Sequence, residues 1–129
     1  MLMYLILGLG GALGTVARFW VNGVVSRYFP TFPMGTLVIN VTGSFIISFF
    51  ATLTDPEGRF FVSPTYRAFF MTGICGGYIT FSSFSLQTLN LAADSEWLFA
   101  GLNIVSSVTL GMFAAWLGHV AALLLKPKG

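Results

Sequence analysis

The sequence contains very little charge. Only 8% of its 129 residues are charged, with 6 Lys and Arg and 4 Asp and Glu, whereas a soluble domain carries about 25%. So few charged side chains cannot keep the surface of a folded domain in water. The basic residues are also scattered, so the chain lacks the clustered Lys and Arg that a nucleic-acid partner requires. With 56% hydrophobic residues and a mean hydropathy of +0.86, the chain is predicted to be an integral protein of the lipid bilayer.

Cysteine is nearly absent as well. The single Cys75 excludes an intrachain disulfide and a multi-cysteine metal site, and its position in an apolar run is typical of a packing residue. No Ser/His/Asp or Cys/His arrangement has supporting context, so we expect no enzyme. The apolar N-terminus lacks the basic segment of a signal peptide, so we predict a retained membrane helix there.

Long apolar runs define the fold class. A helix needs about 20 apolar residues to cross the hydrocarbon core. We predict an all-α integral membrane protein with a single domain over residues 1–129 and four transmembrane helices, over residues 2–27, 34–53, 67–92 and 97–125. The connections carry helix breakers and acidic residues, namely Pro30, Pro33, Asp55, Glu57, Asp94 and Glu96.

The loop charges give a weak prediction of topology. Arg59, Arg67, Lys126 and Lys128 fall on the side of both termini, whereas Arg27 and Arg18 fall on the other. This excess favours cytoplasmic termini, and we expect a multi-pass protein of the cell inner membrane. The excess is also small enough to permit insertion in both orientations.

The placement of polar residues argues against proton-coupled transport, because all four carboxylates fall in connections. His119 lies near the end of the last span, where an interfacial role is the ordinary one. Arg18 is the one charge within a span. Its guanidinium either forms an electropositive vestibule for anions or reaches the headgroups by snorkelling.

Three further features concern the middle of the membrane. Gly76 and Gly77 lie within a run longer than the hydrocarbon core requires, and a break at the glycines or a tilt of the helix would absorb the excess. Phe81 and Phe84 share one helix face, where their ring edges could stabilise an anion or could simply pack or face lipid. Asn40 belongs to a polar stripe and either donates to an anion or joins two helices by hydrogen bonds.

These motifs together resemble the Fluc (CrcB) family of small fluoride channels, over nearly the whole chain. The resemblance depends on residues 10–14 with Arg18, on residues 35–40 with Gly43, and on Asn103 with Ser106 and Ser107. Its most specific part is the run Gly76-Gly77-Tyr78-Ile79-Thr80-Phe81-Ser82-Ser83-Phe84-Ser85.

The resemblance implies an antiparallel, dual-topology homodimer with two fluoride pores and a third helix broken at mid-membrane. It also implies a structural Na⁺ at the dimer interface, held by the backbone carbonyls of Gly76 and Ile79. Family members usually have Thr where this chain has Ile79, which preserves a carbonyl ligand but removes a hydroxyl. The implied pore residues are Phe81, Phe84, Asn40, Ser107 and Thr80, with Arg18 in the vestibule.

The function expected from the resemblance is passive, fluoride-selective export from the cytoplasm, which relieves fluoride toxicity. Moving bare fluoride into a low dielectric costs tens of kcal/mol by Born estimates, so a pore must supply donors along its length. Two alternatives remain at this stage. One is a small multidrug-type exporter, which the missing membrane carboxylate disfavours; the other is a non-transporting membrane assembly protein.

Overall fold

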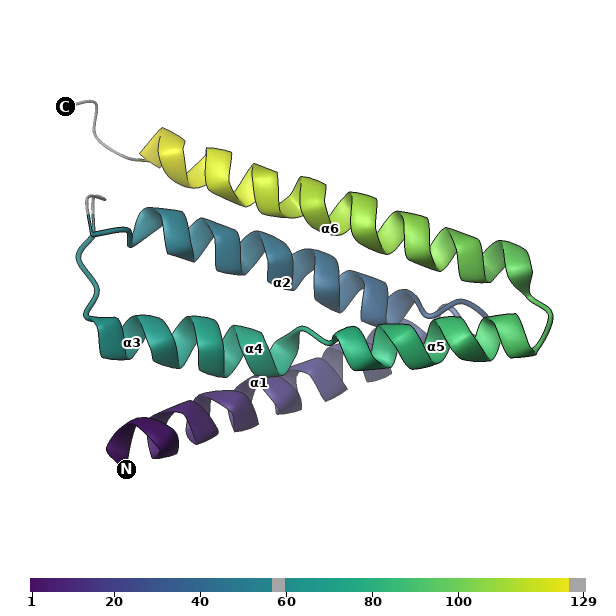
Figure 1. Cartoon of the computed structure of the whole chain (residues 1–129), viewed down its shortest axis with the longest axis horizontal. Helices are drawn as coiled ribbons and strands as arrows, with labels where there is room; N and C mark the ends of the chain where they lie inside the picture. Colours follow the sequence, from purple (N-terminus) through teal and green to yellow (C-terminus); the bar gives the residue numbers. More distant parts are fainter. Residues whose placement is uncertain (57–59, 126–129) are drawn as a thin grey trace.

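The computed structural model describes residues 1–56 and 60–125, and all the secondary-structure elements of these residues are helices (Figure 1). The predicted charges of Glu57, Arg59, Lys126 and Lys128 lie outside the described residues. Four helical spans are long and apolar enough to cross a membrane, which makes the chain a multi-pass membrane protein. They comprise α1 (Leu2–Ser26), α2 (Met34–Leu53), a composite third span (Pro64–Ala93) and α6 (Trp97–Leu125).

The third span consists of several elements. It begins with α3 (Pro64–Ala68), continues as a π-helix, η1 (Phe69–Cys75), and then as α4 (Gly76–Tyr78). After two extended residues it ends as α5 (Phe81–Ala93). The start is encoded locally, because the Ser63 side chain accepts a hydrogen bond from the Tyr66 amide and Pro64 occupies the first turn.

A tight turn reverses the chain between α5 and α6. Ser95 has φ 61°, the one positive φ of a non-glycine residue in the described part of the chain. Its amide donates to the Ala92 carbonyl at 3.1 Å, and the Glu96 amide donates to the Leu91 carbonyl at 2.8 Å. This pair of bonds is a Schellman motif, which satisfies the last carbonyls of α5 and directs α6 back along it.

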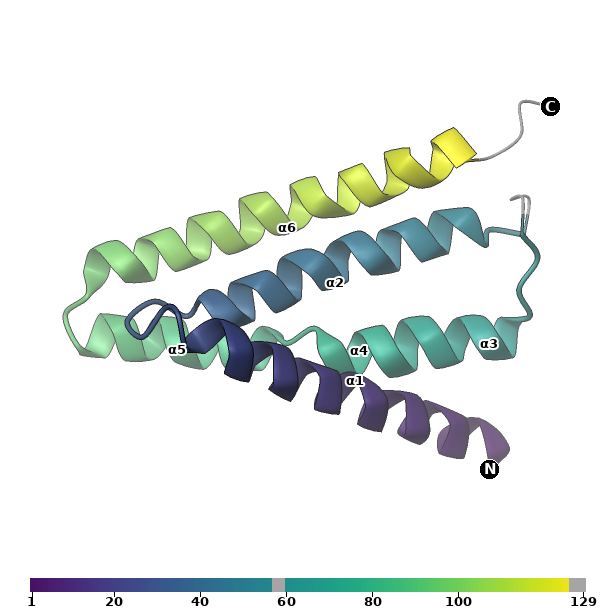
Figure 2. The same ribbon diagram turned by 180° about the vertical axis from the view of Figure 1, so that it is seen from behind.

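The helices pack through glycines where two backbones meet. In Figures 1 and 2, α6 lies along α2, and α1 crosses the third span. A Cβ on Gly10 would lie 2.8 Å from the Phe69 carbonyl oxygen, and one on Gly14 would fall on the Ile74 carbonyl oxygen. The π-helix therefore presents its carbonyls to α1 at a distance that only glycine allows.

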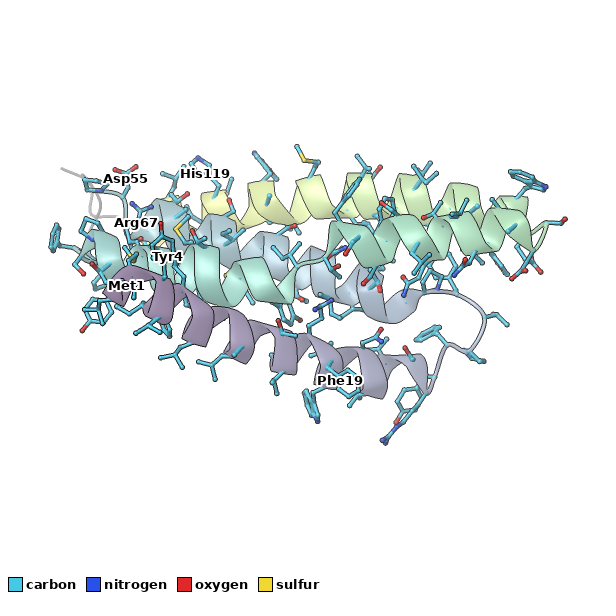
Figure 3. All side chains as sticks on the ribbon, turned by 60° about the horizontal axis from the view of Figure 1, so that its bottom comes forward. Met1, Tyr4, Phe19, Asp55, Arg67 and His119 are labelled. Carbon is cyan, nitrogen blue, oxygen red and sulfur yellow. The ribbon has the colours of Figure 1, made fainter. Side chains whose placement is uncertain are left out.

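Large apolar side chains cover the outside rather than the inside. Leu9, Phe19 and Trp116 are exposed, whereas the largest fully buried side chains are Ile39 and the polar Asn103. Figure 3 shows side chains projecting outward from the helices along the length of the chain. Lipid rather than water suits such a surface, because contiguous apolar area of this extent is rare on soluble monomers.

Candidate functional site

The third span is interrupted at Ile79 and Thr80 (Figure 1). Ile79 has ψ 143° and Thr80 has φ −143° and ψ 115°, so both are extended. The sequence predicted the break at Gly76 and Gly77, and this position is wrong because both glycines are helical. A Cβ on Gly77 would lie 2.6 Å from the Gly11 carbonyl oxygen, so this glycine allows close packing on α1 instead.

Asn40 on α2 stabilises the break by two hydrogen bonds to Thr80. Its Nδ2 donates to the Thr80 carbonyl at 2.9 Å, and the Thr80 amide donates to Asn40 Oδ1 at 2.8 Å. In a continuous helix the Thr80 amide would donate to the Gly76 carbonyl. The Asn40 side chain therefore replaces a helical hydrogen bond and releases that carbonyl. The helix-joining role considered for Asn40 is present, and its second N–H remains available to another acceptor.

Thr80 also begins the second half of the span. Its hydroxyl accepts a hydrogen bond from the Ser83 amide at 3.2 Å and lies 3.2 Å from the Ser82 hydroxyl. Thr80 is thus the N-cap of α5. A helix C-terminus is partly negative and a helix N-terminus is partly positive, so the two half-helices direct opposite dipole ends to the break. The N-terminal end of α5 can attract an anion, and the C-terminal end of α4 can attract a cation.

Phe81 and Phe84 lie on the first turn of α5, directly after the break. Their ring centroids are 5.6 Å apart, with an interplanar angle of 48°. Phe81 is 77% exposed, whereas Phe84 is half-buried. Phe81 therefore packs against little of its own chain and presents its ring to whatever lies outside the subunit.

Arg18 lines a partly open cavity of about 150 Å³ that reaches the break at Thr80. Within the described residues, its Nε is enclosed and has no hydrogen-bond acceptor. None of the described residues that line the cavity is a carboxylate, so the one formal charge among them is positive. A guanidinium with an unsatisfied Nε among hydroxyl and amide groups is suited to an anion. The other polar lining residues are Thr15, Asn22, Thr36, Ser83 and Gln87.

Gln87 connects this cavity to a second hollow of about 260 Å³ near the α1–α2 connection. The second hollow is also lined by Ser26, Asn90 and Asp94, so polar groups continue to the end of α5. Sequence reasoning missed Gln87. The signal was present, because residues 80, 83, 87, 90 and 94 are polar at helical spacing.

Ser107 lies on α6, outside the lining of the Arg18 cavity. Its hydroxyl is 3.5 Å from Asn103 Oδ1, and Asn103 Nδ2 donates to the Thr88 hydroxyl at 2.9 Å. The Thr88 hydroxyl in turn donates to the Phe84 carbonyl at 2.8 Å. Asn103 is 1% exposed, so this chain of bonds joins α6 to α5 in the interior.

The predicted sodium ligands are the carbonyl oxygens of Gly76 and Ile79, one on each side of the α4 C-terminus. Gly76 is exposed on the surface of the single chain. Carbonyl oxygens at an unwound half-helix end are suitable ligands for Na⁺, but two of them are too few for a complete site. In the described part of the chain, no group of three His, Cys, Asp or Glu side chains could hold a metal ion.

Comparisons with known proteins agree with these features. The family described as "CrcB-like protein, Camphor Resistance (CrcB)" matches residues 5–119. A protein of Opitutus terrae, named fluoride-specific ion channel FluC, is 60% identical over 124 residues, covering 95% of this chain and 94% of its own. A FluC of Paramagnetospirillum magneticum is 56% identical over 126 residues, covering 97% and 98% of the two chains. This chain therefore belongs to the CrcB-like family.

Proposed function

We propose that the protein is a fluoride-selective channel through which fluoride leaves the cytoplasm passively. It is a transport protein and not an enzyme. The observation that supports this function best is the interrupted third span, where Asn40 fixes the break beside an electropositive cavity. The identity with proteins named fluoride-specific ion channel, over 95% of the chain, supports the choice of anion.

The proposed path begins at the hollow near Asn90 and passes Gln87 to reach Arg18. Fluoride is small and strongly hydrated, so each lost water must be replaced by a donor. Hydroxyls and amides line the cavity, and the positive end of α5 faces the break. Beyond the break, the ring edges of Phe81 and Phe84 supply the next positive surface. Ser107, on the neighbouring helix, would complete the pore wall.

We propose that two antiparallel copies form the working channel, inserted in both orientations into the cell inner membrane. Phe81, Ser82 and Ser85 are exposed on α5 of a single chain. Hydroxyl groups at mid-membrane are unsuited to lipid contact, so a second copy that covers this face would stabilise it. The same pairing would bring the Gly76 and Ile79 carbonyls of both copies together around one structural Na⁺.

Passive flow is favoured over proton-coupled export by the positions of the acidic residues. Asp55, Asp94 and Glu96 all lie in connections between helices. A small multidrug-type exporter would need a titratable acid within the bilayer, and the described spans hold none. A purely structural assembly role would not account for the unsatisfied Nε of Arg18 or for the cavity that Arg18 lines.

The test replaces the two phenylalanines. Phe81→Leu and Phe84→Leu should reduce fluoride efflux from liposomes while dimers persist in cross-linking, because Phe81 contributes little packing to its own chain. The matched control is Phe113→Leu on α6, which is also exposed and lies away from the break. If the variant with both substitutions still forms dimers and still conducts fluoride at the full rate, the proposed pore roles are refuted.

A further inference from the structure

A hollow of about 330 Å³ lies at the start of the third span, between that span and the connection before it. Its described walls are mostly apolar, and Arg67 carries the one formal charge among the described lining residues. Figure 3 places Arg67 at the end of the molecule that holds Met1 and Asp55, whereas Phe19, next to Arg18 in the sequence, lies near the middle. The hollow shares no lining residue with the two hollows of the proposed fluoride path, so it is separate from that path. Its apolar lining includes Pro56, Phe61, Val62, Ala68 and Met71.

Arg67 retains unused hydrogen-bonding capacity. Its Nη2 donates to the Ala51 carbonyl at 3.3 Å and contacts Met71 Sδ at 3.7 Å. Among the described residues, its Nε is enclosed without an acceptor. Among the described residues that line the hollow, none is a carboxylate. A guanidinium in this condition is suited to a phosphate group, which can accept two parallel hydrogen bonds from it.

The depth of Arg67 corresponds to the lipid headgroups. The third span has 30 residues, so at about 1.5 Å per residue it exceeds the ~30 Å hydrocarbon core. Arg67 follows the first residue of this span by less than one turn. Its neighbour Tyr66 is 68% exposed, as expected of an aromatic residue at the membrane interface.

We propose that this hollow binds one anionic phospholipid, with the phosphate on Arg67 and the start of an acyl chain against Phe61, Val62 and Met71. The hollow combines a cationic end with an apolar wall, which is the pattern of an amphiphile. A zwitterionic lipid would bring its own cation toward the Arg67 guanidinium, so a net negative headgroup is preferred. The proposal does not depend on fluoride transport.

Native mass spectrometry of the detergent-purified full chain tests this site. Phosphatidylglycerol should remain bound at least about tenfold better than phosphatidylcholine, and Arg67→Gln should abolish the preference. Arg67→Lys should retain part of it, because the charge remains but the planar fork is lost. Arg27→Gln is the matched control, since Arg27 lies at the end of α1 and does not line the hollow.

A second variant separates the site from general folding effects. Ala68→Phe would fill the hollow and keep Arg67, so it should also lower phosphatidylglycerol retention about tenfold while the melting temperature stays near wild type. Equal retention of the two lipids by the wild-type chain would overturn the proposal. Displacement of the lipid by soluble glycerol phosphate at equal concentration would also overturn it, because the site would then recognise phosphate alone.

Discussion

The pair of hydrogen bonds between Asn40 and Thr80 yields the sharpest prediction. Both bonds are short, at 2.9 Å and 2.8 Å, and Thr80 is 8% exposed. Asn40→Ala leaves the buried Thr80 amide without its acceptor and the Thr80 carbonyl without its donor. Hydrogen bonds between membrane helices contribute about 0.6 kcal/mol on average and up to about 1.7 kcal/mol. The loss should therefore be about 1–3 kcal/mol, which changes the equilibrium between intact and distorted breaks about 5- to 150-fold.

The assay combines thermal unfolding in detergent with fluoride efflux from liposomes. Asn40→Ala should lower both stability and flux, because Phe81 and Phe84 follow the break directly. Ser48→Ala is the matched control, since Ser48 is a polar residue of the same helix, α2, and lies about two turns beyond Asn40. Loss of flux without any loss of stability would refute the role of Asn40 in stabilising the break and would assign Asn40 to the pore alone. Unchanged flux and stability would refute both roles.

Three other predictions concern packing, charge and the ion. Gly14→Ala should destabilise the fold by about 1–3 kcal/mol or more in thermal unfolding, because its Cβ would fall on the Ile74 carbonyl oxygen. Gly8→Ala has nothing within 4 Å and should change stability by less than about 1 kcal/mol; equal effects would contradict the packing described. Arg18→Gln should lower fluoride efflux about tenfold or more, equivalent to about 1.4 kcal/mol, while Arg27→Gln leaves it unchanged; an active Arg18→Gln channel would remove the cavity from the path. Replacing all Na⁺ by N-methylglucamine should abolish efflux from liposomes, and undiminished efflux would exclude the proposed sodium site.

The sequence predicted the class of fold because hydrophobic length is a strong local signal. Each span is visible as an apolar run, and the composition excludes a soluble protein. The position of the break was not predictable from glycine content. Gly76 and Gly77 are both helical. Glycine is required at position 77 by close packing on α1 and not by backbone freedom. The break instead falls where Asn40, 40 residues earlier, supplies a substitute partner for Thr80.

The candidate site shows the same division between local and long-range information. Phe81, Phe84, Arg18 and Thr80 could be singled out from motifs and from intramembrane polarity. Gln87 could have been found from polar spacing along α5, but its position between two hollows depends on how α1, α2 and α5 meet. Contacts of this kind join residues far apart in the chain and have no signature in a single sequence.

The most direct test of the proposed function is anion efflux from liposomes that contain the purified protein, measured with ion-selective electrodes and without a proton gradient. We predict rapid release of fluoride while chloride is retained, because the path supplies donors for a small anion and the described spans hold no acid for proton coupling. Equal release of both ions would contradict selectivity, and release of neither ion would contradict the channel itself.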